Sequence, residues 1–301
     1  MDLNPRQLEA FRLVMIGGSM TVAAEMLKVS QPAVSRLVKD LETAVGMRLF
    51  RREGNRLIAG REAQILFAEV DRFHVGMERM ARVARDLKSA RAGSLRIASM
   101  TALALTYMTD GLRRFRADHA EVEISLEALN SRSVLQAAST HQVDIGFLQL
   151  GGDYPGLDVI PVPNLHAAVM VPARHALARK AAVRLRDLEG QSVITLGRNS
   201  PLRTRVDLAL ASAKVQCERP IETSLGFSAC GLAAGGLGIA IVDPFTAAHW
   251  AGEGLVRRRL VPAIPFEFSM VLPAHRPRSA VVSRFIDVMA RLFREKVAGH
   301  A

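Results

Sequence analysis

Apolar residues in the first 45 positions recur every three or four residues, which predicts three short helices joined by tight turns. The first helix should end at Gly17-Gly18, because a glycine readily takes the left-handed conformation that closes a helix. Thr21 is a suitable N-cap for the second helix, and Ser30 for the third. The positions expected to be buried are Leu8, Phe11 and Met15 in the first helix and Val34, Leu37, Val38, Leu41 and Val45 in the third.

The third predicted helix has a second face that is polar and basic. Pro32, Ser35, Arg36 and Lys39 lie opposite the apolar positions, and Pro32 falls in the first turn, where a missing N–H is tolerated. A helix with this outward face can enter the major groove of DNA and reach base edges and phosphates. An ordinary helical hairpin with a solvated polar face has the same spacing and remains the alternative.

The segment 49–58 is predicted to form two short strands around a Gly54-Asn55 turn. Arg51, Arg52 and Arg56 cluster at the tip of this hairpin. Because it directly follows a helix-turn-helix, we interpret it as a wing that lies against phosphates or reaches a minor groove. A surface hairpin with solvated arginines is the other interpretation.

These segments resemble the winged helix-turn-helix of the LysR-type transcriptional regulators. A C-terminal run from Gly254 to Pro277 further resembles the lysine-biosynthesis and octopine-type branch of that family. The chain departs from the family at Ala59-Gly60-Arg61-Glu62, where a threonine is usual, so the following linker helix should form with a looser start. The matching N-terminal identities are Ala23-Ala24-Glu25, Ser30-Gln31-Pro32-Ala33-Val34-Ser35-Arg36, Leu41-Glu42, Gly46 and Leu49-Phe50-Arg51-Arg52.

The resemblance and the two basic faces together define a candidate DNA-binding set. We expect the wing arginines and Lys39 to contact phosphates, and the start of the third helix to lie near bases. The candidate residues are Thr21, Ser30, Gln31, Pro32, Ser35, Arg36, Lys39, Arg51, Arg52 and Arg56.

A single long helix is predicted between the wing and residue 90. Its apolar positions alternate steps of four and three, which is the seam of a coiled coil and favours pairing with the same helix of a second copy. Packing of the stripe on the protein's own body is the alternative. The seam consists of Leu66, Val70, Phe73, Met77, Met80, Ala84 and Leu87.

Residues Ala90-Arg91-Ala92-Gly93 should end this helix, and short apolar strands then alternate with helices. This rhythm predicts an α/β domain with largely parallel sheets, and it restarts after about residue 163. Helices are expected from about Leu103, Ser131, Ser200 and Ser228. The resemblance implies a two-lobed effector domain like the periplasmic binding proteins, with crossovers near residues 162 and 266 and the last strand and helix returning to the first lobe.

The expected architecture is therefore α/β with an N-terminal winged helix-turn-helix, a long linker helix and a two-lobed, periplasmic-binding-protein-like effector domain. The DNA-binding domain should span residues 1–61 and the dimerisation helix residues 62–91. The effector-binding domain should span residues 92–301, with lobe I at 92–162 and 267–301 and lobe II at 163–266.

A ligand cleft is expected where strands end and helices begin. Four such junctions carry a small hydroxyl or amide residue beside free backbone N–H groups, which attract carboxylates. Each Ser or Thr taken alone is better explained as a helix cap, and Phe227 either covers a ligand or fills the hinge. The candidate effector-binding residues are Ser99, Met100, Thr101, Asn130, Ser131, Thr195, Arg198, Phe227 and Ser228.

Composition supports this interpretation without deciding it. The chain has 301 residues and a formal net charge of +11, which suits a polyanionic partner. Residues 1–61 carry ten Lys/Arg and six Asp/Glu, so the positive excess is not confined to the DNA-binding part. No run of eighteen apolar residues and no signal-peptide layout are present, and the two cysteines, Cys217 and Cys230, suggest a reducing compartment.

An enzyme is the main competing class. Gly235-Gly236-Leu237-Gly238 has the wrong spacing for a dinucleotide loop and precedes a strand, and no histidine pairs with a cysteine at metal-ligand spacing. A constitutive architectural DNA-binding protein is a further alternative, although it would not need a large two-lobed domain. We therefore expect a non-enzymatic, ligand-responsive regulator with no cofactor and no metal.

Partners and location follow from the resemblance. They are double-stranded DNA, RNA polymerase and a small amino-acid or carboxylate effector, with a homodimer through the linker helix and a homotetramer of two dimers. LysR-type relatives usually activate a nearby divergent promoter, and a cytoplasmic, nucleoid-associated bacterial location is expected.

Overall fold

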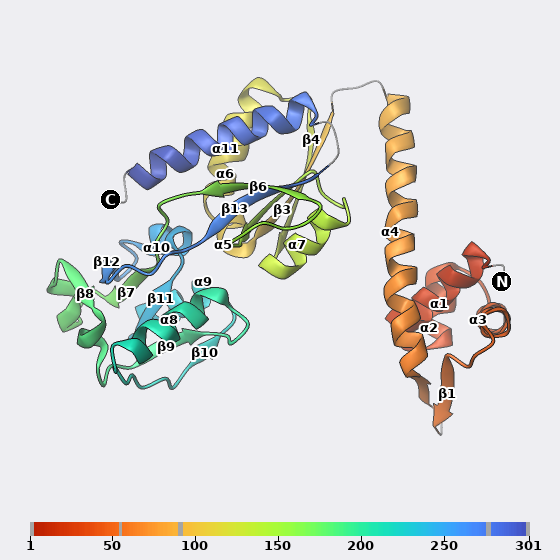
Figure 1. Cartoon of the computed structure of the whole chain (residues 1–301), viewed down its shortest axis with the longest axis horizontal. Coiled ribbons are helices and arrows are strands. Elements are labelled where there is room, and N and C mark those ends of the chain that lie inside the picture. Colours follow the sequence, from red (N-terminus) through yellow and green to blue (C-terminus); the bar gives the residue numbers. More distant parts are fainter. Residues whose placement is uncertain (1–2, 54–55, 90–92, 275–277, 299–301) are drawn as a thin grey trace. The chain divides into compact units, whose positions relative to one another are not determined.

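The computed structural model describes residues 3–53, 56–89, 93–274 and 278–298 (Figure 1). The chain divides into two compact units, Met1–Ala90 and Arg91–Ala301. The Gly54-Asn55 turn and the predicted helix break at residues 90–92 lie outside the described residues. The first unit contains α1 (Pro5–Gly17), α2 (Met20–Leu27), α3 (Gln31–Val45), β1 (Phe50–Glu53), β2 (Arg56–Ala59) and α4 (Arg61–Ser89).

Helix boundaries in the first unit follow local backbone chemistry. Gly18 closes α1 with a φ of 67°, and its N–H donates to the Val14 carbonyl. The prediction that Thr21 caps α2 is wrong. The Ser19 hydroxyl accepts from Val22 N at 3.1 Å, because α2 begins at Met20 and Thr21 already lies inside its first turn. Ser30 does stand at the N-cap of α3, but its side chain accepts no capping hydrogen bond from the described residues.

The apolar faces predicted for α1 and α3 form the core of this unit. The wing strands pair antiparallel, with Phe50 opposite Ala59 and Glu53 opposite Arg56. The Phe11 and Phe50 rings pack 5.8 Å apart, which attaches the first wing strand to α1. Leu8, Phe11, Val34, Val38 and Leu41 are buried, and Met15, Leu37 and Val45 are partly buried against them.

The apolar seam of α4 divides into two parts. Leu66 and Val70 pack into the core of the first unit, so the alternative of packing on the protein's own body holds for this turn of the helix. Phe73, Met77 and Met80 are 45%, 44% and 61% exposed, respectively. The side chains of Ala84 and Leu87 lie outside the described part. The exposed stretch of the seam is therefore free to meet another surface.

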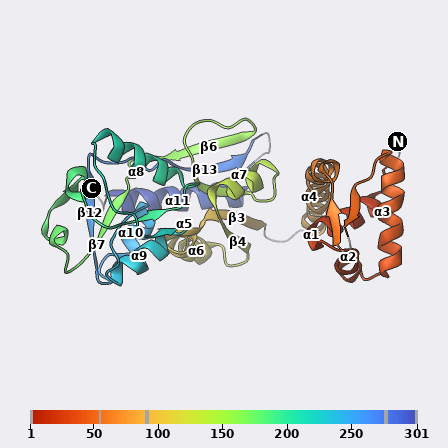
Figure 2. The ribbon, with the colours of Figure 1, turned by 90° about the horizontal axis from the view of Figure 1, so that it is seen from below.

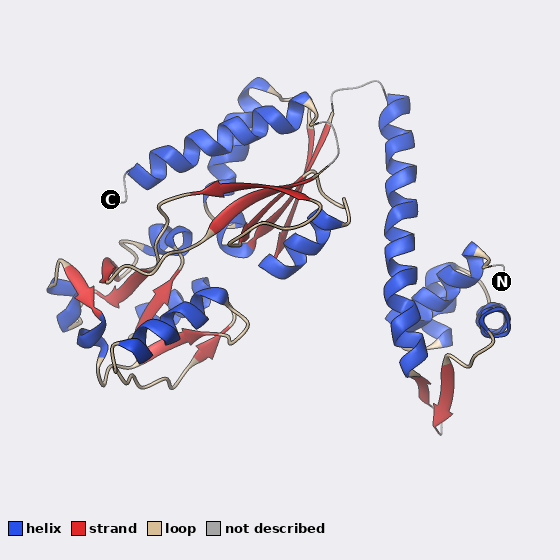
Figure 3. Cartoon of the chain, viewed as in Figure 1, coloured by secondary structure: helices blue, strands red, loops and turns tan. Residues whose placement is uncertain are grey.

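The first lobe of the second unit is a three-layer α/β structure (Figure 3). Its five-stranded sheet has the order β4-β3-β5-β13-β6, and Figure 2 shows β6 beside β13. Helices α6 and α11 cover one face and α7 covers the other. The elements are β3 (Ser94–Met100), α5 (Thr101–Ala104), α6 (Tyr107–Asp118), β4 (Glu123–Leu129), α7 (Ser131–Ser139), β5 (Ile145–Gln149), β6 (Leu157–Val162), β13 (Phe268–Pro273) and α11 (Ala280–Ala298).

The second lobe has a six-stranded sheet with the order β10-β9-β11-β7-β12-β8. Helix α9 packs on one face of this sheet and α8 on the other. Its strands are β7 (Ala168–Pro172), β8 (Ala182–Arg184), β9 (Val193–Leu196), β10 (Glu222–Thr223), β11 (Ile239–Val242) and β12 (Leu255–Val261). Its helices are η1 (Ala176–Arg179), η2 (Leu185–Leu188), α8 (Pro201–Ser212), α9 (Gly226–Ala234) and α10 (Pro244–Trp250).

The prediction of largely parallel sheets is only partly right, because both sheets are mixed, and parallel pairs such as β9 with β10 and with β11 stand beside antiparallel ones. In the first lobe β3 runs parallel to β4 and β5, whereas β13 runs antiparallel to β5 and β6. In the second lobe β7 runs antiparallel to β11 and β12. The antiparallel strands adjoin the crossovers, where extended chain rather than a helix connects the strands. Two helices also begin earlier than predicted, α5 at Thr101 and α9 at Gly226.

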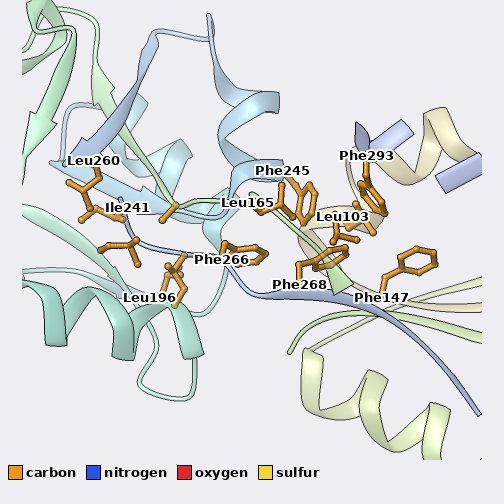
Figure 4. Close-up of a cluster of buried hydrophobic side chains, with 14 of the residues drawn as sticks. Leu103, Phe147, Leu165, Leu196, Ile241, Phe245, Leu260, Phe266, Phe268 and Phe293 are labelled. Carbon is orange, nitrogen blue, oxygen red and sulfur yellow. The ribbon is translucent and has the colours of Figure 1, made fainter. Parts of the chain in front are cut away.

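A continuous hydrophobic cluster joins the two lobes (Figure 4). The chain leaves the first sheet after Val162, returns to it at Phe268, and carries Leu165 and Phe266 through the cluster. Phe245 of α10 is fully buried at its centre, with its ring 4.9 Å from that of Phe268 and 5.5 Å from that of Tyr107. The last strand and helix return to the first lobe, as predicted.

Candidate DNA interface and ligand cleft

The outward face of α3 presents the polar set expected from the sequence. Pro32, Arg36 and Lys39 are exposed, and Gln31 and Ser35 are half-buried beside them. Opposite them, Val34 and Leu41 are fully buried, so the helix cannot rotate this face inward without exposing its core. Among the described residues, neither Arg36 nor Lys39 has an ion-pair partner, and both cations are available to an external anion.

A groove of about 570 Å³ runs between α3 and the wing. Ser35, Lys39, Arg48 and Arg51 line it and supply three positive charges. Glu42 also lines the groove, but its carboxylate is already occupied, because it accepts from Leu49 N at 2.7 Å and from Phe50 N at 3.1 Å. Glu42 therefore fixes the angle at which the wing leaves the third helix.

The wing itself is described only in part. Arg51 and Glu53 form an ion pair at 3.0 Å, with both side chains more than half exposed. Such a pair is weak and leaves Arg51 free to exchange its partner for a phosphate. The side chains of Arg52 and Arg56 lie outside the described residues. Thr21 is exposed on α2, and Ser30 is exposed immediately before α3.

The candidate ligand residues of the first lobe meet at the carboxyl ends of three parallel strands. Thr101 opens α5, and its hydroxyl donates to the Leu129 carbonyl at 3.4 Å. Asn130 caps α7 by accepting from Ser133 N at 2.9 Å, and the Ser131 hydroxyl accepts from Gln149 N at 3.0 Å. Met100 is half-buried, whereas Ser99 is fully buried and offers no surface to a ligand in this conformation.

The second-lobe candidates lie at the ends of β9 and β10. Thr195 is 7% exposed and its hydroxyl donates to the Ile221 carbonyl at 3.3 Å. Arg198, in the loop before α8, is exposed and has no ion-pair partner among the described side chains. Ser228 is exposed on the first turn of α9. Phe227 packs instead against α10, with its ring 5.1 Å from that of His249.

The first-lobe and second-lobe candidates are connected by a contact between α5 and α10. Helix α5 begins at Thr101 and packs against α10, the helix that holds the Phe227 ring. Phe227 was expected either to cover a ligand or to fill the hinge. In the structure its ring packs on the second lobe's own aromatic residues. The capping explanation holds for Asn130, while Ser131 bonds a neighbouring strand rather than its own helix.

Sequence reasoning missed Gln149. This residue ends β5 beside Ser131, is 8% exposed, and its buried Nε2 has no hydrogen-bond partner among the described residues. An unsatisfied buried donor costs free energy, which a ligand oxygen would recover. Its only sequence signal is a polar residue at the end of an apolar strand, a pattern shared with many residues that do not bind ligands.

An ion pair that the sequence did not suggest links α8 to the return crossover. The Arg205 guanidinium lies 2.6 Å from the Glu267 carboxylate. Gly151 allows the approach, because a side chain there would collide with Glu267. Gly151 and Glu267 border a pocket of about 480 Å³ formed by the segment after β5 and both crossovers.

Buried polar groups at the hinge have shifted proton affinities. Burial raises the pKa of the Tyr107 phenol to about 12, although the nearby Arg257 opposes the change. Burial likewise raises the pKa of Asp243, and the hydrogen bonds that its carboxylate accepts from Thr246 and from Phe245 N act in the opposite direction. Cys230, beside Asp243, has its thiol pKa raised to about 12 by burial and is therefore unreactive as a thiolate.

Comparison with known proteins resolves the family. Residues 5–64 match the model of the bacterial regulatory helix-turn-helix protein of the lysR family, and residues 88–294 match the LysR substrate binding domain. The chain belongs to the LysR family of transcriptional regulators. The resemblance seen in the sequence and the expected fold class are thereby confirmed.

LysR-family relatives align along nearly the whole chain. The regulatory protein NocR of Agrobacterium fabrum is 44% identical over 283 residues, covering 94% of each chain. The octopine catabolism/uptake operon regulatory protein OccR of Rhizobium meliloti is 37% identical over 284 residues, again covering 94% of each. A crystal structure of full-length CbnR with its target DNA has a TM-score of 0.73 at 18% identity and covers 96% of this chain and 100% of that one.

Family membership assigns the broad function. This LysR-type chain is a DNA-binding transcriptional regulator with a substrate-binding domain, and the architectural and enzymatic alternatives are not favoured. Its relatives are regulators rather than enzymes. The described helices include none long and apolar enough to cross a membrane. Within the same residues, no group of three or more metal-binding side chains comes together.

Proposed function

We propose that this regulator binds an operator through α3 and the wing, as a dimer paired along α4, and that a small amino-acid-like or carboxylate effector between its lobes modulates this binding. In this proposal residues 1–61 bind DNA, residues 62–91 pair the copies and residues 92–301 hold the effector. Lobe I comprises about 92–162 and 267–301, and lobe II about 163–266.

The DNA part of the proposal is supported by two cations of α3 that have no ion-pair partner within the residues the structure describes. Arg36 and Lys39 protrude from a helix whose other face is locked in the core, and the adjacent groove adds Arg48 and Arg51. We assign Gln31, Pro32, Ser35 and Arg36 to base edges, because residues at the start of a recognition helix enter the groove. Phosphate contacts are assigned to Lys39 and the wing arginines Arg51, Arg52 and Arg56, with Thr21 and Ser30 flanking them.

Dimerisation is supported by the exposed part of the α4 seam. Phe73, Met77 and Met80 occupy positions that face a partner in a two-stranded coiled coil, and their burial would remove apolar surface from water. Two DNA-reading units on one operator raise the overall affinity by effective concentration. A tetramer of two such dimers is the assembly we expect.

The effector part is carried by a single observation: the buried Nε2 of Gln149, near Thr101, Asn130 and Ser131, has no hydrogen-bond partner in the described part of the chain. This amide would donate to a ligand carboxylate, and Arg198 on the opposite lobe would supply a bidentate partner. OccR is named for the octopine operon, which makes an amino acid or an opine-like compound the preferred effector class. Thr195, Phe227 and Ser228 complete the second-lobe side.

The mechanism couples ligand to DNA through the angle between the lobes. A ligand shifts this angle only in proportion to its preference for one state. The changed angle alters how the effector domains pack in the assembly, and with it the spacing of the DNA-binding units and the bend of the DNA. RNA polymerase then responds. In this scheme the protein works in the bacterial cytoplasm, and it catalyses no reaction and needs no cofactor.

A thermal-shift screen of the full chain against amino acids and related carboxylates tests the effector site. The variant Thr101→Ala/Arg198→Ala should lose the ligand-dependent stabilisation and keep the operator affinity of the unliganded protein. Gln149→Leu should lose it as well, because it removes the buried donor while retaining an apolar side chain of similar size.

Thr109→Ala/Arg174→Ala is the matched control, since both residues are exposed and outside the candidate set. It should retain the full ligand response. An unchanged response in both the Thr101→Ala/Arg198→Ala and Gln149→Leu variants would show that the effector binds elsewhere.

A further inference from the structure

A second pocket, of about 1130 Å³, lies at the hinge and contains none of the candidate effector residues. Both crossovers line it, together with β12 of the second lobe and α11 of the first. The volume slightly exceeds the range of about 300–1,000 Å³ that is usual for pockets enclosing small organic ligands. It is thus large enough for a ligand of its own.

The walls of this hinge pocket are mainly apolar. Leu165, Leu260 and Phe293, all labelled in Figure 4, belong to the cluster that joins the lobes and also border the pocket. Ala290 and Met270 extend the apolar lining along α11 and β13. A ligand with a hydrocarbon body would replace water along these side chains.

The polar part of the lining is basic. Arg257, Arg259 and Arg294 border the pocket, and among the described residues that line it there is no aspartate or glutamate. These three arginines form no ion pair with any carboxylate in the part of the chain that the structure describes. The charge of the pocket is therefore complementary to an anion, with three guanidinium groups able to bind a carboxylate in bidentate fashion.

Arg257 is the most constrained of the three cations. Its side chain is half-buried, and burial lowers the pKa of its guanidinium. Removing a charge from water without a counter-ion costs free energy, and a bound carboxylate would offset that cost. Arg259 and Arg294 are exposed and can close around the head of a ligand.

From these observations we propose that the hinge pocket is a second ligand site, which binds an amphipathic organic anion with its carboxylate on the arginines and its apolar body along Leu165, Leu260 and Phe293. The site is separate from the effector site that we propose at the strand ends. Because its ligand would touch both lobes and both crossovers, it would favour one lobe angle and so add a second input to the same switch.

Calorimetric titration of the full-length protein with octanoate tests the proposal, with octan-1-ol as the uncharged probe of equal length. Octanoate should bind saturably and more tightly than octan-1-ol. Arg257→Met/Arg294→Met should weaken octanoate by about tenfold or more and leave octan-1-ol nearly unchanged. Ala290→Phe, which fills the pocket from α11, should weaken both probes.

The cleft variant Arg198→Met is the matched control and should bind octanoate like the wild type. No saturable octanoate binding, or equal binding by wild type and Arg257→Met/Arg294→Met, would overturn the proposal. Loss of binding in Arg198→Met would place octanoate in the cleft and overturn it too. An affinity that falls as protein concentration rises would show that a second copy covers the pocket, with the same consequence.

This test is independent of the effector proposed for the cleft. In Arg257→Met/Arg294→Met the thermal shift produced by the amino-acid effector should remain. If octanoate fails to bind while that shift persists, only the hinge site is wrong. If the shift is absent from the wild type while octanoate binds, only the cleft assignment fails.

Discussion

The two units of this regulator carry their candidate functional residues in opposite ways. In residues 3–53 the DNA-facing side chains protrude from one helix and are spare: Arg36 and Lys39 are exposed and unpaired among the described residues. In the first lobe of the effector unit the candidates belong to the fold. Asn130 caps α7, Ser131 bonds the end of β5, and Ser99 is fully buried.

This difference follows from what each unit binds. DNA is a large, rigid surface, so a protein meets it with a protruding face that needs no internal partners. A small ligand is enclosed, so its site is built from strand ends and helix starts whose polar groups already satisfy the backbone. Substitution in the first unit should therefore change binding with little effect on stability, whereas substitution in the second should change both.

The largest expected effect concerns the exposed seam of α4, through which we propose that two copies of the first unit pair. Phe73→Glu/Met77→Glu places charges where a coiled coil needs apolar side chains, so the dimer should dissociate. Operator affinity should then fall by about 10²–10⁴-fold, because the second DNA-binding unit no longer benefits from effective concentration. Analytical ultracentrifugation and operator titration measure the two effects.

Ala68→Glu is the control for this pair, because Ala68 is exposed on the same helix away from the seam. It should remain dimeric. A dimer that survives Phe73→Glu/Met77→Glu would transfer the interface to another surface.

The next effect separates the stabilities of the units. Phe245 is fully buried at the joint of the lobes, and Phe245→Ala should lower the unfolding free energy of the effector unit by about 3–5 kcal/mol. The fluorescence of Trp250, the only tryptophan in the chain, reports denaturant unfolding of that unit.

Phe11→Ala gives the reciprocal result in the first unit. It should lower the stability of the helical DNA-binding unit, measured by circular dichroism, and leave the Trp250 transition in place. A Trp250 transition that moves equally in both variants would mean that the two units unfold as one.

A smaller effect compares two N-cap residues, one in each unit. Asn130 accepts a capping hydrogen bond, and Ser30 accepts none from the described part of the chain. Asn130→Ala should therefore cost about 1 kcal/mol of stability, and Ser30→Ala less than about 0.5 kcal/mol. Chemical denaturation of each variant provides the values. Equal costs would remove the distinction between spare and structural polar residues.

The last effect is a pH dependence that is absent at neutral pH and is confined to the effector unit. The Tyr107 pKa is raised from 10.0 to about 12, so the folded state holds the phenolic proton more tightly than the unfolded state. The stability from this neutral phenol is complete below pH 10 and is lost as pH rises from about 10 to about 12. Absorbance titration of the wild type minus Tyr107→Phe should give a midpoint of about 12. A midpoint of about 10 would contradict the burial of this group.

Contiguous patterns proved predictable from the sequence. The helices of the first unit, their buried faces and the wing strands follow from spacing within a few residues. The α2 cap was missed because Ser19 and Thr21 have the same hydroxyl chemistry, and only the position of Gly18 decides between them. The antiparallel strand pairs were missed. Alternating strands and helices predict parallel neighbours, whereas the strands next to the crossovers pair without an intervening helix.

Contacts between segments far apart in the sequence could not be predicted from the sequence, for a different reason. Glu42 holds the wing, and Arg205 meets Glu267 across 62 positions of chain, although each residue alone resembles any surface charge. Gln149 is distinguished only by its buried amide nitrogen, which has no hydrogen-bond partner among the residues that the structure describes. The hinge pocket likewise depends on arginines from β12 and α11 that share no local pattern.

One comparison tests the central claim, which is that the outward face of α3 reads DNA sequence. An operator is selected from a random DNA pool by the wild-type protein, and the affinities of Arg36→Ala and Lys39→Ala for operator and random DNA are measured over a range of salt concentrations. Arg36→Ala should lose about 1–3 kcal/mol of discrimination between the two DNAs. Lys39→Ala should weaken both alike and lower the salt slope by about one. If Arg36→Ala weakens operator and random DNA equally, α3 contacts only the backbone and the account is contradicted.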